Sequence, residues 1–153
     1  MQQKIKSFIV DPDILDKIFI AFENKSPFNL KKSIKNIMNE YSINDVKEFY
    51  VYLSLELNVA YSNAKQSNYI YHNKKYFKIA IIKLRMKDRN NNSGKSKGWR
   101  IIALVDDENN IFYLLDLYSH SQGKDNLSYN EEKKIRLLCD EYAENVTIGG
   151  KNE

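Results

Sequence analysis

The chain of 153 residues has one cysteine, two histidines and no long apolar run. Because Cys139 is the only cysteine, an internal disulfide is excluded, which fits a reducing compartment. No stretch approaches the roughly 18 apolar residues that a membrane-spanning helix needs. The first residues, MQQKIKSFIVDPD, are too charged for a secretory signal. We therefore expect a cytoplasmic protein with no membrane partner, and we interpret Cys139, at an apolar helical position, as a core residue.

The scarcity of metal ligands and of glycine-rich motifs also limits the chemistry. His72 and His120 are the only histidines, and no carboxylates cluster near the basic residues. This gives poor ligand geometry for a metal-dependent nuclease. Gly94-Lys95-Ser96 resembles the end of a phosphate-binding loop, but the upstream glycine of that motif is absent. We expect no metal and no cofactor.

The composition, with 29% charged and 42% hydrophobic residues, predicts one globular domain over residues 1–153. Its charge is concentrated in the middle of the chain. Residues 74–105 carry ten Lys and Arg residues against one acidic residue, whereas residues 106–153 carry five against eleven. Such a basic block is typical of a site for a polyanion, although it also fits a solvated strand face followed by a basic loop. Charge alone favours nucleic acid as the partner.

Three helices are predicted in the first part of the chain, over about residues 11–65, after a short strand over residues 5–10. Their apolar residues recur at helical spacing over residues 12–23, from 27 to 41, and from about 43 into the early sixties. The N-cap signals are Asp11, Ser26 and Ser42, the last in a box with Asp45. We interpret these apolar stripes as core-facing rather than as a cofactor site.

From Tyr69 the apolar residues recur at every second position, which predicts strands. The expected strands are Tyr69–Tyr71, Tyr76–Lys87, and the runs Ile101–Val105 and Ile111–Leu117, which flank an Asp-Asp-Glu-Asn-Asn turn. Ser128 and Glu131 form a capping box at the start of a C-terminal helix. This sheet and helix span about residues 69–145. The predicted fold class is α+β, with N-terminal helices followed by an antiparallel sheet of about four strands and a C-terminal helix.

Basic side chains line one face of the second predicted strand. Lys83, Arg85 and Lys87 alternate along it, so they stand about 7 Å apart, close to the spacing of phosphates along one nucleic-acid strand. Arg100 shares a face with Ile102 in the next strand, which places its guanidinium close to the sheet. The planar fork of a guanidinium suits a phosphate.

The segment between these two strands is polar and basic. Lys95 and Lys97 lie in it, and we interpret it as a clamp for a polyanion. Trp99 follows at the start of the next strand. Its ring either stacks on a base or packs against the sheet, and the sequence leaves both alternatives open.

The run from Lys95 to Ser128, KSKGWRIIALVDDENNIFYLLDLYSHSQGKDNLS, resembles the C-terminal half of RelE/HigB-like toxins of bacterial type II toxin–antitoxin modules. The match extends over about Phe77 to Leu138. The resemblance implies a curved antiparallel sheet flanked by helices. It also implies cleavage of messenger RNA, in many members on the ribosome, and inhibition by a cognate antitoxin. The implied reaction is attack by the ribose 2′-hydroxyl on the adjacent phosphate without a metal.

The resemblance also assigns roles to individual residues. Arg100 matches the strand arginine that stabilises the phosphate, and Lys83, Arg85 and Lys87 match basic residues of the preceding strand. Tyr118 and His120 match the end of the last strand, where His120 is the candidate base or acid because imidazole titrates near pH 6.5. The predicted catalytic set is Arg100, His120, Tyr118, Lys83 and Arg85, and the predicted RNA-binding set is Lys87, Lys95, Lys97, Trp99 and Lys124.

Several alternatives remain open at this point. Tyr118 fits a packing residue equally well, His120 fits a surface histidine, and His72 fits a structural residue in a turn. The rival to an enzyme is a fold of this kind without catalysis. Such a protein would be a nucleic-acid-binding module, or a protein-interaction module that holds an acidic partner.

Overall fold

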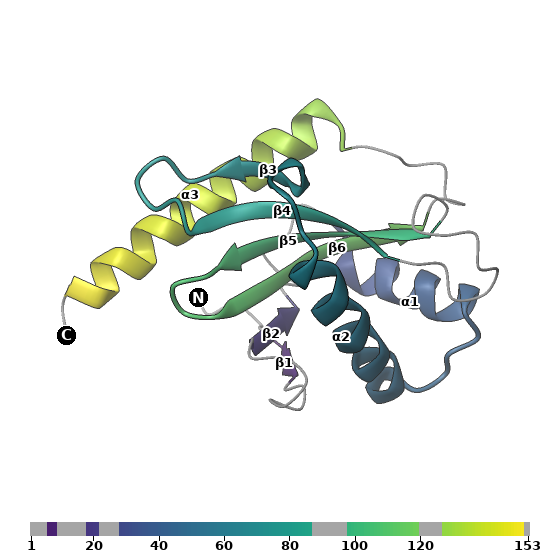
Figure 1. Cartoon of the computed structure of the whole chain (residues 1–153). Coiled ribbons are helices and arrows are strands. Elements are labelled where there is room, and N and C mark those ends of the chain that lie inside the picture. Colours follow the sequence, from purple (N-terminus) through teal and green to yellow (C-terminus); the bar gives the residue numbers. More distant parts are fainter. Residues whose placement is uncertain (1–5, 9–17, 22–27, 87–97, 120–126, 152–153) are drawn as a thin grey trace.

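The computed structural model describes residues 6–8, 18–21, 28–86, 98–119 and 127–151 (Figure 1). The elements are β1 (Lys6–Phe8), β2 (Ile18–Ala21), α1 (Leu30–Glu40), α2 (Val46–Ser62), the 3₁₀ turn η1 (Gln66–Asn68), β3 (Tyr69–His72), β4 (Ile79–Met86), β5 (Trp99–Asp106), β6 (Ile111–Ser119) and α3 (Tyr129–Lys151). None of the described helices is long and apolar enough to cross a membrane.

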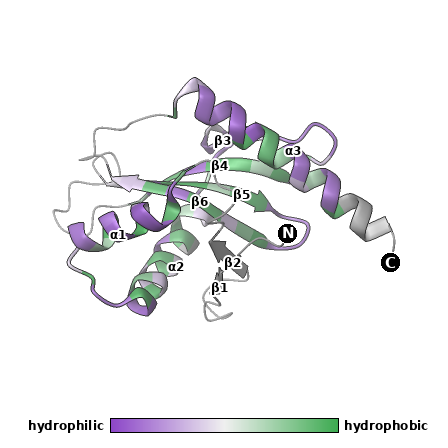
Figure 2. Ribbon diagram, turned by 180° about the vertical axis from the view of Figure 1, so that it is seen from behind, coloured by the Kyte–Doolittle hydropathy of each residue, from purple (hydrophilic) through white to green (hydrophobic). Residues whose placement is uncertain are grey.

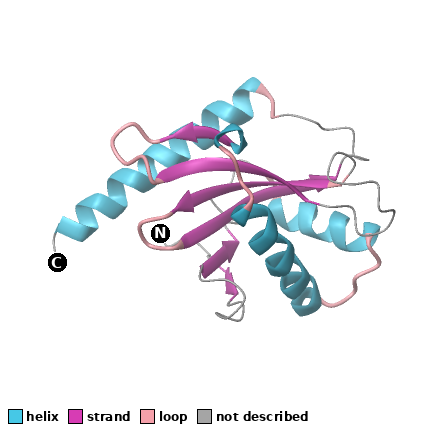
Figure 3. Cartoon of the chain, in the orientation of Figure 1, coloured by secondary structure: helices cyan, strands magenta, loops and turns pink. Residues whose placement is uncertain are grey.

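The predicted α+β fold is confirmed. Strands β3 to β6 form an antiparallel sheet, which β2 extends by pairing with β6 in parallel, and β1 pairs with β2 at the edge. Helices α1 and α2 lie on one side of the sheet and α3 runs along the other (Figure 1 and Figure 3). In Figure 2 the central strands are mostly hydrophobic, whereas α1 and α3 alternate between hydrophilic and hydrophobic turns. The molecule therefore has a helix layer on each face of a buried sheet.

The predicted helix over residues 12–23 is wrong where the structure describes it. Ile18–Ala21 is strand β2, and the remaining residues of that prediction lie outside the described part of the chain. The run Ile18-Phe19-Ile20 combines β-branched and aromatic side chains, which favour a strand. A short apolar run of this kind cannot be assigned by periodicity alone. The short strand expected over residues 5–10 is present as β1.

The next two helices are confirmed, but they begin later than their predicted caps. The N-cap of α1 is Asn29, whose side chain accepts a hydrogen bond from Lys32 N at 3.2 Å. The N-cap of α2 is Asp45, which accepts from Lys47 N at 2.9 Å. Ser42 has a φ of 55° and belongs to the turn between the helices. Each helix begins after the residue whose side chain accepts a hydrogen bond from an N–H group of the first helical turn.

The two faces of the sheet contribute to separate clusters of buried side chains. On one face, residues of α1 and α2 such as Ile37 and Leu53 pack on Leu84 and Ile101. On the other face, Ile135, Leu138 and Cys139 of α3 pack on Ile79, Ile81, Ile102 and Leu104. The predicted capping box starts α3, since Ser128 N donates to Glu131 Oε1 at 2.9 Å and Glu131 N donates to Ser128 Oγ at 3.2 Å.

The β5–β6 turn anchors both helix layers. Tyr142 of α3 donates to Asp106 Oδ2 at 2.6 Å, and Tyr61 of α2 donates to Asp107 Oδ1 at 2.6 Å. Burial, together with the hydrogen bond to Asp107, raises the pKa of Tyr61 above its ordinary value. Asn109 also donates to Asp106. The helices are thereby fixed to the turn end of the sheet, and Arg85 and Arg100 lie toward the opposite end.

The buried thiol gives a first test of the packing. Cys139 is fully buried, with Sγ 3.9 Å from Ile79 O, and burial raises the pKa of its thiol to about 12. Because the reactive species is the thiolate, Cys139 is expected to remain unmodified by DTNB in the folded protein at pH 8. One thiol should titrate after unfolding in guanidinium. Rapid modification of the folded protein would contradict this packing.

Candidate nucleic-acid interface

Three of the predicted site residues lie side by side across the sheet. Arg85 of β4 is directly opposite Arg100 of β5, and Arg100 is directly opposite Tyr118 of β6. Directly paired residues in an antiparallel sheet have their Cα atoms about 5 Å apart and point to the same face. Tyr118 belongs to the cluster on the α3 side of the sheet, so all three point to that side. We call these three residues, two cations and the tyrosine beside them, the cationic row.

Lys83 extends the cationic row along β4. It lies on the same face as Arg85, two positions earlier, and is opposite Ile102. Its backbone carbonyl accepts a hydrogen bond from Asn68 Nδ2 at 3.0 Å, beyond the last β3–β4 pair at Ile82. The predicted alternation of this strand is therefore confirmed, because Ile79 and Ile81 pack under α3 whereas Lys83 is half-buried and Arg85 is exposed.

Arg100 is the most deeply placed of these cations. Its side chain is 5% exposed, and Nη1 donates to Gly98 O at 3.4 Å. Placing a guanidinium this deep costs solvation unless it has polar partners, and it fixes the cation in one position. Tyr118, at 3% exposure, packs beside it. The row therefore runs from a solvated guanidinium at Arg85 to a fixed one at Arg100.

Trp99 lies on the opposite side of the sheet, and its predicted contact with RNA is contradicted. The side chain is 0% exposed and its ring centroid is 6.1 Å from Tyr41, 6.2 Å from Phe49 and 6.1 Å from Tyr52. Successive residues of a strand point to opposite faces. Since Arg100 points to the α3 side, Trp99 must point to the side that α1 and α2 cover, which is the packing alternative.

Five predicted site residues lie outside the described residues: His120, Lys87, Lys95, Lys97 and Lys124. The strand ends that these segments adjoin are described. Met86, Trp99 and Ser119 pair with one another across β4, β5 and β6 at the end of the sheet next to the cationic row. The three strand termini from which these segments leave therefore lie together at one end of the sheet. The roles of the five residues remain predictions.

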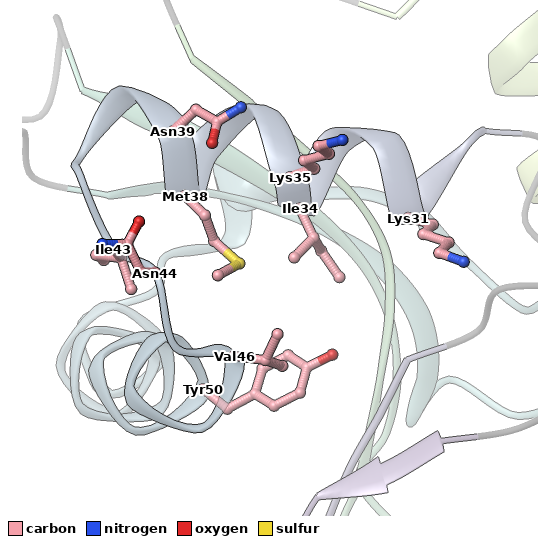
Figure 4. A pocket seen from close by; sticks show the side chains of 9 residues that line it. All are labelled: Lys31, Ile34, Lys35, Met38, Asn39, Ile43, Asn44, Val46 and Tyr50. Carbon is pink, nitrogen blue, oxygen red and sulfur yellow. The ribbon is translucent and has the colours of Figure 1, made fainter.

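A cleft that the sequence did not reveal lies between α1 and α2. It has a volume of about 360 Å³, with Ile34, Met38 and Val46 in its wall and Lys31 and Lys35 at its border. Figure 4 shows Ile34 and Met38 pointing from α1 toward the Val46 and Tyr50 side chains of α2. The cleft is in the α1–α2 layer, on the other side of the sheet from the cationic row. It is therefore not part of the predicted site.

Neither metal-binding groups nor comparisons with known proteins give a further indication of function. Within the described ranges, no group of three or more His, Cys, Asp and Glu side chains is arranged to hold a metal ion. Comparison of the chain with family models, with curated proteins and with solved structures finds no match. What the protein does must therefore be argued from the cationic row and its surroundings.

Proposed function

We propose that this protein is an endoribonuclease that cleaves messenger RNA, in the manner of the RelE/HigB-like toxins that its sequence resembles. The observation that carries the proposal is the cationic row, with Arg85, Arg100 and Tyr118 side by side and Lys83 next to them. A phosphate placed over the row would meet a fixed guanidinium and a solvated one. Such preorganised charge is the main requirement for stabilising the transition state of phosphate cleavage without a metal.

The proposed reaction is an internal transesterification. A base removes the proton of the ribose 2′-hydroxyl, and the 2′-oxygen forms a bond to the adjacent phosphorus. The bond from phosphorus to the 5′-oxygen breaks, and an acid supplies the proton that this oxygen takes up. The products are a 2′,3′-cyclic phosphate and a 5′-hydroxyl. Arg100 and Arg85 balance the charge that develops on the phosphorane oxygens.

The proton transfers are assigned to the end of β6. His120 is our candidate base or acid, since an imidazole with its ordinary pKa of about 6.5 can take up or give a proton near neutral pH. It directly follows Ser119, which is paired with Trp99 next to the row. The Tyr118 hydroxyl is the second candidate. The proposal includes binding to the ribosome, inhibition by a cognate antitoxin, a cytoplasmic location and no requirement for a cofactor.

A second candidate function is RNA binding without cleavage. The burial of Arg100 and Tyr118 favours it, because two of the proposed catalytic side chains have little exposed surface. In that case Lys83 and Arg85 would hold the phosphates, and Arg100 would be a structural residue below them. Both candidates predict RNA binding that weakens steeply with salt.

The test separates the two candidates by the chemistry of the product. The purified full chain is added to a translation extract that contains an end-labelled messenger RNA. We expect discrete cuts whose upstream fragments end in a 2′,3′-cyclic phosphate, and a single 2′-deoxy nucleotide at a cut site should abolish that cut. Expression in bacteria should arrest protein synthesis.

Intact RNA in the extract and normal growth at high expression would overturn the enzyme proposal. Salt-dependent RNA binding in the same preparation would then favour the second candidate. Co-purification with a small acidic protein and no RNA binding would instead indicate a protein-interaction module.

A further inference from the structure

Three aromatic rings are stacked at the β3–β4 hairpin, at the other end of β4 from the cationic row. The His72 ring lies parallel to the Phe77 ring, with centroids 3.9 Å apart and an interplanar angle of 2°. On its other side, His72 stacks on Tyr69 at 4.8 Å and 24°. The sequence predicted a strand from Tyr76 to Lys87, but β4 begins at Ile79, which leaves Phe77 in the turn.

The turn and the imidazole are both fixed by hydrogen bonds. The Asn73 side chain accepts from Lys75 N at 3.0 Å and from Tyr76 N at 2.8 Å. His72 Nδ1 lies 3.1 Å from Phe77 O, and His72 Nε2 lies 2.9 Å from Gln66 Nε2. A neutral imidazole that donates from Nδ1 and accepts at Nε2 satisfies both contacts. These hydrogen bonds therefore hold the His72 ring in its place between Tyr69 and Phe77.

The outer end of the stack faces solvent. Phe77 is 65% exposed although one face of its ring rests on His72, so the surface that it shows includes the opposite face. The neighbouring Lys74 and Lys75 are exposed. Lys78 is exposed as well, and it makes a 3.2 Å ion pair with Glu108. A flat aromatic surface between lysines is the arrangement that proteins use for unpaired bases of single-stranded nucleic acids.

We propose that Phe77 is a second RNA contact, on which an unpaired base stacks as the fourth ring of the Tyr69–His72–Phe77 series. Lys74 and Lys75 bind the phosphates on either side of that base. Tyr69 and His72 pair with Ile82 and Ala80 of β4, and Tyr69 packs in the cluster under α1 and α2, so the stack is a contact separate from the cationic row on the α3 side. The proposal rests on the proposed function for the identity of the ligand, and it adds where the RNA is held away from the cut.

The test measures binding of a fluorescein-labelled single-stranded RNA by anisotropy, with 2′-O-methyl riboses so that no cleavage occurs. Phe77→Ala is expected to weaken binding by about tenfold, the loss of one aromatic–base stack. Phe77→Leu keeps an apolar side chain on His72 but removes the flat ring, and it should weaken binding as much as Phe77→Ala. Phe77→Trp should bind like the wild type, and its fluorescence should be quenched when RNA is added.

Val51→Ala is the matched control. Val51 is 57% exposed in the first half of α2 and is not part of the aromatic stack, so its truncation should leave binding unchanged. Circular dichroism verifies that each variant is folded. Wild-type affinity in folded Phe77→Ala and Phe77→Leu would overturn the proposal, as would a labelled duplex that binds with the same dependence on Phe77.

The outcomes also separate this inference from the proposed function. If the chain binds RNA through Phe77 but cuts none in the translation extract, the enzyme proposal fails and this inference stands. If it cuts RNA, and the Phe77 variants bind and cut as the wild type does, this inference alone fails.

Discussion

Replacing Arg100 by alanine is expected to lower the rate of RNA cleavage by about 10²- to 10³-fold, the usual effect of removing one preorganised group that stabilises transition-state charge. Arg100 occupies the centre of the cationic row, between Arg85 and Tyr118. Its guanidinium is held at 5% exposure, so water cannot replace it at equal strength. The measurement is the single-turnover rate on a labelled RNA in a translation extract, together with relief of growth arrest in cells.

Two further variants make this result specific. Arg100→Lys keeps the charge but lacks the planar fork, so it should restore only part of the rate. Arg136→Ala removes a guanidinium on α3 whose side chain is 52% exposed, and it should change the rate by less than about twofold. Wild-type cleavage by a folded Arg100→Ala protein would remove the cationic row from the mechanism.

Replacing Trp99 by alanine is expected to lower the free energy of unfolding by about 3–5 kcal/mol, the range measured for large aromatic side chains in protein cores. Trp99 is fully buried and its ring is surrounded by Tyr41, Phe49 and Tyr52, so the substitution leaves a large cavity between the sheet and both N-terminal helices. A domain of ordinary stability, about 5–15 kcal/mol, would lose about a fifth or more of its free energy of unfolding. The measurement is urea denaturation followed by circular dichroism, because Trp99 is the only tryptophan.

The same variant distinguishes packing from base stacking. Trp99→Phe keeps a ring in the cluster and should lose less stability than Trp99→Ala. Under conditions where both variants are folded, each should bind RNA as tightly as the wild type does. If a Trp99 variant kept the wild-type free energy of unfolding but bound RNA more weakly, Trp99 would belong to the RNA interface.

The local pattern of this chain predicted most of the sheet and which candidate side chains share a face of their strand. Alternation along β4 correctly placed Lys83 and Arg85 on one face, because a strand repeats every two residues wherever it lies. The pairing of Arg85 with Arg100 was beyond prediction, since the long connection between β4 and β5 does not fix their register. Trp99 showed the same limit. Its position in a strand was predictable, but only the helices on that face decide that the ring is buried.

The N-terminal residues show why other parts of the fold could not be predicted from the sequence. Ile18–Ala21 has an apolar pattern that fits either a short strand or part of a helix, and a long-range contact decides between them. That contact is the parallel pairing with Ile111–Leu114 of β6. The stacked rings at Phe77 were missed for a related reason, because the turn held by Asn73 delays the start of β4 to Ile79, whereas alternation predicted a strand from Tyr76.

The pairing of β2 with β6 also has a consequence for how the chain is made. Synthesis proceeds from the N-terminus, so β2 leaves the ribosome early, and its partner β6 (Ile111–Ser119) is the last of the described strands to follow. The cationic row has the same requirement, because Tyr118 belongs to that last strand. A nascent chain therefore holds neither the finished sheet nor an assembled row until β6 has been made. Each copy of the proposed nuclease would therefore be inactive until its own last strand has been made.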